Sequence, residues 1–114
     1  MPFINTKLSV GLSCEKEAKI KSALGEAIAL LPGKSEKWLM LNFETDCRLW
    51  FAGTNDAPSA YIEVSIFGSA DAGDYEALTG AITKIISAEA GVPADRIYVK
   101  YEESKSWGFN GSNF

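Results

Sequence analysis

The chain has 114 residues, 46% of them hydrophobic and 23% charged, a size and composition that predict one soluble globular domain spanning residues 1–114. Its net charge of −4 argues against nucleic acid as a partner, because there is no basic excess to neutralise phosphates. No apolar run is as long as a membrane span and no signal segment opens the chain, so we expect a cytoplasmic protein without membrane insertion.

The chain opens with Met1-Pro2, followed by a short run of strand-forming residues, 3–8. If Met1 is removed, the nitrogen of Pro2 becomes a free secondary amine, and an α-amino group titrates near pH ~7.7–8.0. Partial burial or a neighbouring cation lowers that pKa, which makes the neutral amine available as a general base at neutral pH. Proline at position two is also common in proteins where it has no chemical role.

The first half of the chain predicts a strand, a helix and a second strand. After the strand at 3–8, Ser13 is a suitable helix N-cap, and Leu31-Pro32-Gly33 ends the helix. Residues 38–44 alternate in polarity and predict the second strand, while 48–51 predict a brief edge strand before a turn. One face of the helix is apolar at helical spacing, formed by Ile20, Leu24, Ala27, Ile28 and Leu31.

The second half repeats the first at an offset of 58 residues. Residues 60–66 predict a strand, 71–89 a helix with Leu78, Ile82 and Ile85 at helical spacing, and 97–101 another strand. Each half is therefore a β-α-β unit, and right-handed crossovers put both helices on one face of a single sheet. The sequence predicts an α+β fold with a two-fold β-α-β pseudo-repeat and a four-stranded main sheet with two helices on one face.

The other face of that sheet has no cover within the chain, and Trp38, Met40 and Tyr61 are large residues available to it. An exposed apolar face of that size predicts self-association around a symmetry axis. The C-terminal residues 107–114 contain the turn Asn110-Gly111 between aromatic residues, which predicts a terminal hairpin. Such a hairpin suits strand addition to a neighbour or closure of a pocket.

The two cysteines, Cys14 and Cys47, are isolated from each other, and the chain has no histidine. Zinc and thioredoxin-like chemistry therefore have no support, and we expect two free thiols without a metal or cofactor.

Taken together, these features resemble the macrophage migration inhibitory factor family of the tautomerase superfamily, over the whole chain. The resemblance rests on an ordered set of motifs: Met1-Pro2, the β-α-β repeat, Gly33-Lys34, Ser65-Ile66-Phe67-Gly68, Asp95-Arg96-Ile97-Tyr98-Val99 and the Trp-Gly-Phe-Asn-Gly-Ser run from Trp107 to Ser112.

The resemblance implies a homotrimer around a central barrel of sheets, with pockets at the subunit interfaces. It also implies cofactor-independent keto–enol tautomerase activity on phenylpyruvate-like or dopachrome-like substrates, with Pro2 as the base. Lys34 and the backbone N–H of Ile66 would bind the substrate, and Tyr98 would come from the neighbouring subunit. The implied aromatic wall consists of Trp38, Trp107, Phe109 and Phe114.

Three departures from the family pattern matter. Lys100 stands where the family has a pocket asparagine, and it adds a cation that would change substrate preference or lower the pKa of the amine further. A C-x-x-C pair present in some members is absent, which places an oxidoreductase role in doubt. Aromatic bulk at Trp38 and Trp107 would narrow the pocket.

Without the resemblance, the residues have simpler interpretations: Lys34 as a solvated cation at a helix end, Tyr98 and Ile66 as core residues, and the C-terminal aromatic residues as packing. An alternative function is a cytokine-like protein, released without a signal peptide, that binds a cell-surface receptor through its trimer surface. Dehalogenation or decarboxylation ranks last, because such chemistry generally uses additional arginines and this chain has only Arg48 and Arg96.

Overall fold

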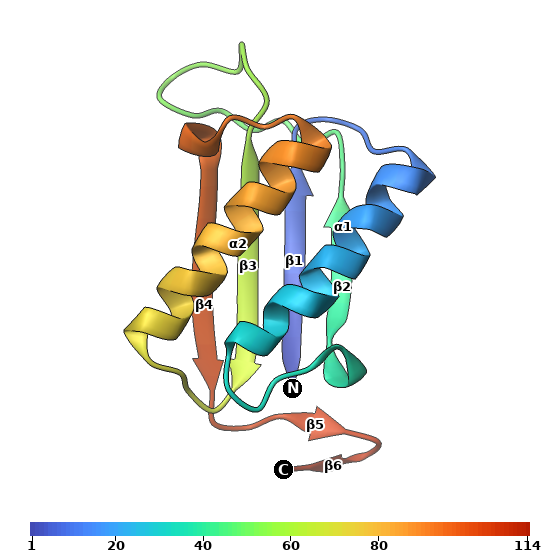
Figure 1. Cartoon of the computed structure of the whole chain (residues 1–114), viewed down its shortest axis with the longest axis vertical. Coiled ribbons are helices and arrows are strands. Elements are labelled where there is room, and N and C mark those ends of the chain that lie inside the picture. Colours follow the sequence, from blue (N-terminus) through green and yellow to red (C-terminus); the bar gives the residue numbers. More distant parts are fainter.

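The computed structural model describes all 114 residues, and two successive β-α-β units make up most of it (Figure 1). The first unit consists of β1 (Pro2–Leu8), α1 (Cys14–Ala27) and β2 (Met40–Glu44). The second consists of β3 (Ala60–Phe67), α2 (Ala72–Ala90) and β4 (Ile97–Ser104). Single 3-10 turns occur at η1 (Ile28–Leu30), η2 (Glu36–Trp38) and η3 (Ala94–Arg96), and the chain ends in the hairpin β5 (Gly108–Phe109) and β6 (Ser112–Asn113).

The four long strands form one mixed sheet in the order β2-β1-β3-β4. β1 is parallel to β2, β3 is parallel to β4, and β1 and β3 are antiparallel at the centre. Phe3 pairs with Met40 in the first half, and Tyr61 pairs with Tyr98 in the second. Each residue of the second pair lies 58 positions after its counterpart, so the predicted repeat is confirmed in the strand register itself.

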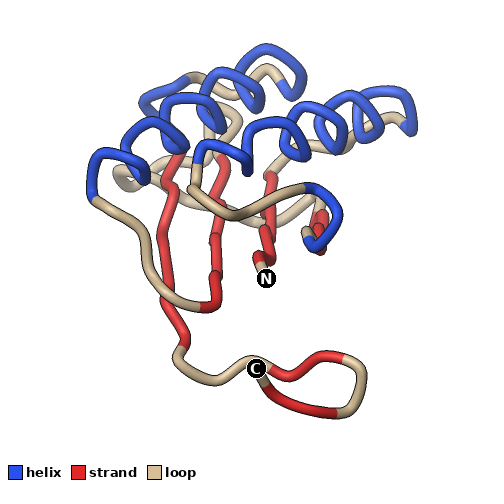
Figure 2. Tube along the Cα trace, turned by 60° about the horizontal axis from the view of Figure 1, so that its bottom comes forward, coloured by secondary structure: helices blue, strands red, loops and turns tan.

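Both helices lie on the same side of the sheet, as Figure 2 shows, and the core fills the space between the layers. The strand residues that face the helices are buried, including Ile4, Leu8, Ile62 and Ile66. The fold class predicted from the sequence is therefore confirmed. Neither helix is long and apolar enough to cross a membrane.

The helix boundaries follow from local chemistry. The Ser13 hydroxyl accepts a hydrogen bond from the backbone N–H of Lys16 at 3.2 Å and caps α1. α2 ends at Gly91, whose φ of 70° is the left-handed conformation that glycine adopts at low cost. In α2 the third fully buried apolar residue is Ile86, whereas the predicted Ile85 is only partly buried.

The second predicted strand begins too early, the last one, 97–101, ends three residues short of Ser104, and the predicted edge strand at 48–51 is absent. The second strand begins at Met40 rather than Trp38, because residues 36–38 close a 3-10 turn. Residues 48–51 form no strand, and Phe51 makes only an isolated bridge to Thr54. The reason is that Ala52 and Gly53 reverse the chain with positive φ angles of 52° and 78°, so the segment folds back on itself before it meets a sheet edge.

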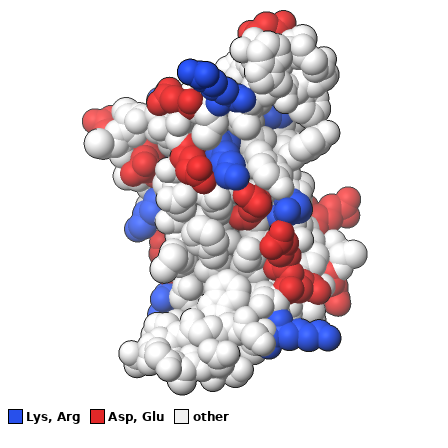
Figure 3. Space-filling view, turned by 180° about the vertical axis from the view of Figure 1, so that it is seen from behind, with Lys and Arg blue, Asp and Glu red and all other residues white.

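The uncovered face of the sheet is more polar than predicted, with acidic and basic side chains across its middle (Figure 3). The Lys7 ammonium lies 3.3 Å from the Glu63 carboxylate. The Lys100 ammonium lies 3.8 Å from the Glu63 carboxylate and 3.0 Å from that of Glu102. Met40 remains largely exposed on this face, but Trp38 belongs to η2 and not to the sheet. The prediction of a broadly apolar face is thus wrong in its centre.

One buried polar atom offers a test of the core. The Thr6 side chain is fully buried, and its hydroxyl has no hydrogen-bond partner. Val64, 58 positions later, occupies the equivalent site in the repeat and is also buried. We expect Thr6→Val to raise the free energy of unfolding by about 1 kcal/mol, because it removes an unsatisfied hydroxyl at nearly constant volume. Urea denaturation at fixed protein concentration measures the change. Val64→Thr should lower stability, and a loss of stability in Thr6→Val would contradict the assignment.

Candidate active site

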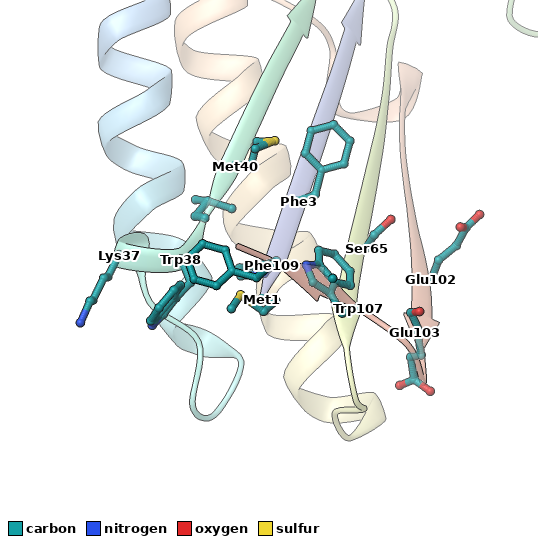
Figure 4. A pocket seen from close by; sticks show the side chains of 14 residues that line it. Met1, Phe3, Lys37, Trp38, Met40, Ser65, Glu102, Glu103, Trp107 and Phe109 are labelled. Carbon is teal, nitrogen blue, oxygen red and sulfur yellow. The ribbon is translucent and has the colours of Figure 1, made fainter. Parts of the chain in front are cut away.

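A pocket of about 850 Å3 opens at the end of the sheet where β1 begins and where β3 and β4 end. Figure 4 shows Met1, Trp38, Trp107 and Phe109 gathered at its centre, with Ser65, Glu102 and Glu103 along β3 and β4. The hairpin β5-β6 lies just beyond this end of the sheet (Figure 1). The lining residues are Met1, Pro2, Phe3, Lys37, Trp38, Leu39, Met40, Ser65, Glu102, Glu103, Ser104, Trp107, Gly108 and Phe109.

Pro2 is buried at the first position of β1, directly beside the pocket. It pairs with Ile66, and proline fits this position because the first residue of a strand tolerates the missing N–H. In the chain that carries Met1, the Met1 carbonyl accepts a hydrogen bond from the Phe67 N–H at 3.0 Å. Removal of Met1 therefore has two effects: the Pro2 nitrogen becomes a free amine, and the Phe67 N–H loses its hydrogen-bond acceptor.

Lys34 extends from the loop after α1 to the end of β3, near the amino terminus, but it does not itself line the pocket. Gly33, with a φ of 79°, turns the chain, and the Lys34 ammonium donates a hydrogen bond to the Phe67 carbonyl at 2.9 Å. The pKa of the Met1 amine is lowered by burial and, to a smaller extent, by the positive charge of Lys34. An amine at this end of β1 is thus held closer to its neutral form.

Ile66 has its side chain in the core and is fully buried. Because Phe67 directs its N–H toward β1, the alternation of a strand directs the N–H of Ile66 the other way, toward β4. Phe67, rather than Ile66, has the backbone donor that faces the N-terminus. Which of these two neighbouring N–H groups faces the N-terminus depends on strand pairing, which the sequence alone does not give.

Three of the four aromatic residues predicted for the wall, Trp38, Phe109 and Phe114, contact one another in sequence. Trp38 meets Phe109 edge to face at 5.2 Å between ring centroids, and Phe109 stacks with Phe114 at 6.3 Å. Phe114 in turn lies 5.8 Å from Phe67 at the end of β3. Trp38, Trp107 and Phe109 line the pocket directly. Phe114 is joined to it through its neighbours, so the hairpin connects the two sides of the site.

Tyr98 and Lys100 do not line this pocket within one chain. Tyr98 is at the opposite end of β4, where it packs against Phe51 at 5.2 Å and lines a smaller hollow of about 340 Å3. Lys100 lies on the uncovered face of the sheet. A hydrogen bond to Glu102 and, to a smaller extent, one to Tyr61 raise the pKa of its ammonium group above the ordinary value. Their role in a site therefore requires a second copy of the chain and stays a prediction.

The polar side of the pocket could not be predicted from the sequence. Glu103 lies opposite Ile66 in the sheet, and its carboxylate accepts a hydrogen bond from the Tyr75 hydroxyl at 2.6 Å. Burial, together with this hydrogen bond, raises the pKa of Tyr75 to about 12. The position of Glu103 at the pocket follows only from the pairing of β1 with β3 and of β3 with β4. No cluster of three or more Cys, Asp or Glu side chains suited to hold a metal ion is present.

The fold and the site define a pseudo-symmetric α+β protein with an aromatic pocket built around its amino terminus. The family model described as macrophage migration inhibitory factor (MIF) matches residues 1–114. The chain therefore belongs to the macrophage migration inhibitory factor family. This membership supports a tautomerase-like function in general terms.

Solved structures agree with this assignment. MIF2 of Leishmania major is 37% identical with a TM-score of 0.93, covering 100% of this chain and 97% of that chain. A macrophage migration inhibitory factor homologue from Prochlorococcus marinus is 30% identical with a TM-score of 0.86, covering 98% of each chain. The Toxoplasma gondii factor, at 20% identity and a TM-score of 0.91, covers 98% of this chain and 99% of that chain and shares the fold. No curated protein sequence matches the chain.

Proposed function

We propose that this protein is a cofactor-independent keto–enol tautomerase for phenylpyruvate-like or dopachrome-like compounds, with Pro2 as its general base after Met1 is removed. The observation that carries the proposal is the position of Pro2, buried at the start of β1 beside an aromatic pocket and near Lys34. An amine in such a place meets the two conditions that lower its pKa, burial and a neighbouring positive charge. The neutral form, which is able to accept a proton, is therefore favoured relative to an ordinary α-amino group.

The reaction moves one proton between carbon and oxygen of the substrate. In the keto-to-enol direction, Pro2 takes the proton from the carbon next to the carbonyl, and the same proton or one from solvent ends on the oxygen. In the reverse direction the enol hydroxyl gives its proton to Pro2, directly or through solvent, and protonated Pro2 then delivers a proton to the carbon, so the enzyme is unchanged after each cycle.

Two groups beside Pro2 suit the carboxylate of an α-keto acid. The Lys34 ammonium supplies a positive charge, and the Phe67 N–H, which loses its Met1 acceptor on processing, supplies a backbone donor. We therefore propose Phe67 in place of Ile66 as the backbone donor. Trp38, Trp107 and Phe109 would pack on the substrate ring and exclude water from the reacting atoms.

We propose that the active form is a homotrimer in which Tyr98 and Lys100 of one subunit complete the pocket of the next. The exposure of large side chains supports self-association: Tyr98 is 62% exposed and Trp50 66%. In such an assembly Tyr98 is a candidate donor to the enolic oxygen. Lys100, already paired with Glu63 and Glu102, would bring a partly neutralised charge.

The test measures phenylpyruvate keto–enol conversion by purified protein whose N-terminus and mass are verified by mass spectrometry and light scattering. Activity well above buffer from a trimer that begins at Pro2 supports the proposal. A correctly processed trimer without activity on phenylpyruvate or a dopachrome analogue would overturn it. The receptor-binding alternative and release from the cell have no particular feature of the structure in their favour and stay predictions.

A further inference from the structure

α1 contains a glycine, Gly25, at the place where the helix contacts the segment 34–38, which leads to the pocket. Gly25 is buried, and a glycine inside a helix costs roughly 0.5–1 kcal/mol relative to alanine. The space that its side chain would fill is taken by Glu36: a carbon added at Gly25 would lie 2.5 Å from Cδ and 3.0 Å from Cγ of Glu36. Only a residue without a side chain allows the Glu36 side chain to lie there.

Charge holds Glu36 at the same place. Its carboxylate lies 3.7 Å from the Lys21 ammonium, and Lys21 is one helical turn before Gly25. Both side chains of this pair are more than half exposed, so the pair contributes little to overall stability. Its effect is instead to fix the direction in which the Glu36 side chain leaves η2.

Glu36 belongs to the segment that carries two of the proposed substrate-binding residues. Lys34 precedes it by two positions and donates to the Phe67 carbonyl, and Trp38 follows by two positions and packs on Phe109. The Glu36 contact with α1 is the third side-chain attachment of this segment, and it lies between the other two. It joins the pocket wall to the helical layer.

The second half of the chain shows that the turn itself does not need this contact. η3 spans Ala94–Arg96, 58 positions after η2, and has the same length. The positions equivalent to Gly25 and Glu36 are Thr83 and Ala94, which cannot form such a contact. The glycine–glutamate contact therefore occurs only in the half that contains Lys34 and Trp38.

We propose that Gly25 and Glu36 are positioning residues of the pocket: the glycine seats the Glu36 side chain against α1 and so holds Lys34 and Trp38 in place. This inference rests on the proposed function, because it gives Lys34 and Trp38 their roles with substrate.

Gly25→Ala should leave the protein folded, because the Glu36 side chain is flexible enough to swing away and alanine favours the helix. The loop then loses its attachment to α1. We expect KM for phenylpyruvate to rise roughly tenfold while kcat changes less than about twofold, since substrate placement suffers and the base is untouched. Glu36→Ala should act in the same direction.

The control is the same substitution in the other helix. Gly80 lies in α2, and nothing stands within 4 Å of a carbon added there. Gly80→Ala should leave KM unchanged. The double variant Gly25→Ala, Glu36→Ala completes a cycle: with the Glu36 side chain gone, the added methyl group has nothing to displace, so the double variant should match Glu36→Ala alone. Additive effects on KM would overturn the proposal.

A second readout does not depend on catalysis. The amides of Lys34, Trp38 and Leu39 donate to turn carbonyls at 3.0, 3.2 and 3.1 Å, and their hydrogen exchange reports on the order of the segment. Exchange should become several-fold faster in Gly25→Ala and Glu36→Ala, and not in Gly80→Ala. If the wild-type protein lacks tautomerase activity but this pattern holds, the proposed function fails and the attachment stands. Unchanged exchange in Gly25→Ala overturns the attachment, whatever the activity.

Discussion

Pro2→Gly should lower kcat/KM for phenylpyruvate by about 10²–10⁴-fold, the usual contribution of a positioned general base. Glycine leaves a primary amine without the ring that fixes the nitrogen at the start of β1, so the base loses its placement. The measurement is the initial rate of keto–enol conversion with the N-terminus of each preparation confirmed by mass spectrometry. This is the largest effect that we expect from any single substitution.

A matched preparation separates the chemistry of the nitrogen from the shape of the pocket. Protein extended at its N-terminus keeps Pro2 in a peptide bond, where its nitrogen has neither a proton nor basicity. It should be as inactive as Pro2→Gly while its circular dichroism and trimer mass match the processed protein. Full activity in either preparation would exclude Pro2 as the base.

Lys34→Met should raise KM by about tenfold or more and move the acid limb of the kcat/KM profile to higher pH. The positive charge of Lys34 lowers the pKa of the Met1 amine, and we expect it to act in the same direction on the Pro2 amine, whose neutral form is the proposed base. Without that charge the pKa rises toward its ordinary value, so a higher pH is needed to reach half of the maximal rate.

Lys84→Met is the control for Lys34→Met, because Lys84 is exposed on α2 and its loss changes the net charge equally. Its pH profile should coincide with that of the wild-type protein. A Lys34→Met profile that does not move, together with an unchanged KM, would show that Lys34 only joins its loop to the Phe67 carbonyl.

Much of the fold could be predicted because its signals are local. Ser13 marks the start of α1, Gly91 the end of α2, and apolar spacing identifies the buried faces of both helices. The errors arose where a short apolar run had no sheet edge to join. Trp38 and the segment 48–51 have strand-like composition, but each lies in or beside a tight turn.

The site was predictable only in part, because some of its residues are far apart in the sequence and come together only through strand pairing. Pro2 was found by its chemistry, and Lys34 through the family motif. Glu103 was missed because it reaches the pocket only through pairing across three strands. The choice between the Ile66 and Phe67 donors depends on which way a single peptide unit faces, and no composition rule gives that.

The repeat gives the chain two related hollows, one at the start of each β-α-β unit. The small hollow near Phe51 is the counterpart of the large pocket, because five residues that line the pocket have equivalents 58 positions later that line the hollow. The pocket residues are Met1, Pro2, Phe3, Trp38 and Met40, and their equivalents are Ser59, Ala60, Tyr61, Arg96 and Tyr98. Ala60 thus stands where Pro2 stands, but its nitrogen is an amide in the middle of the chain. A polypeptide has only one amino terminus, so of these two equivalent strand starts only the one at Pro2 can present a free amine.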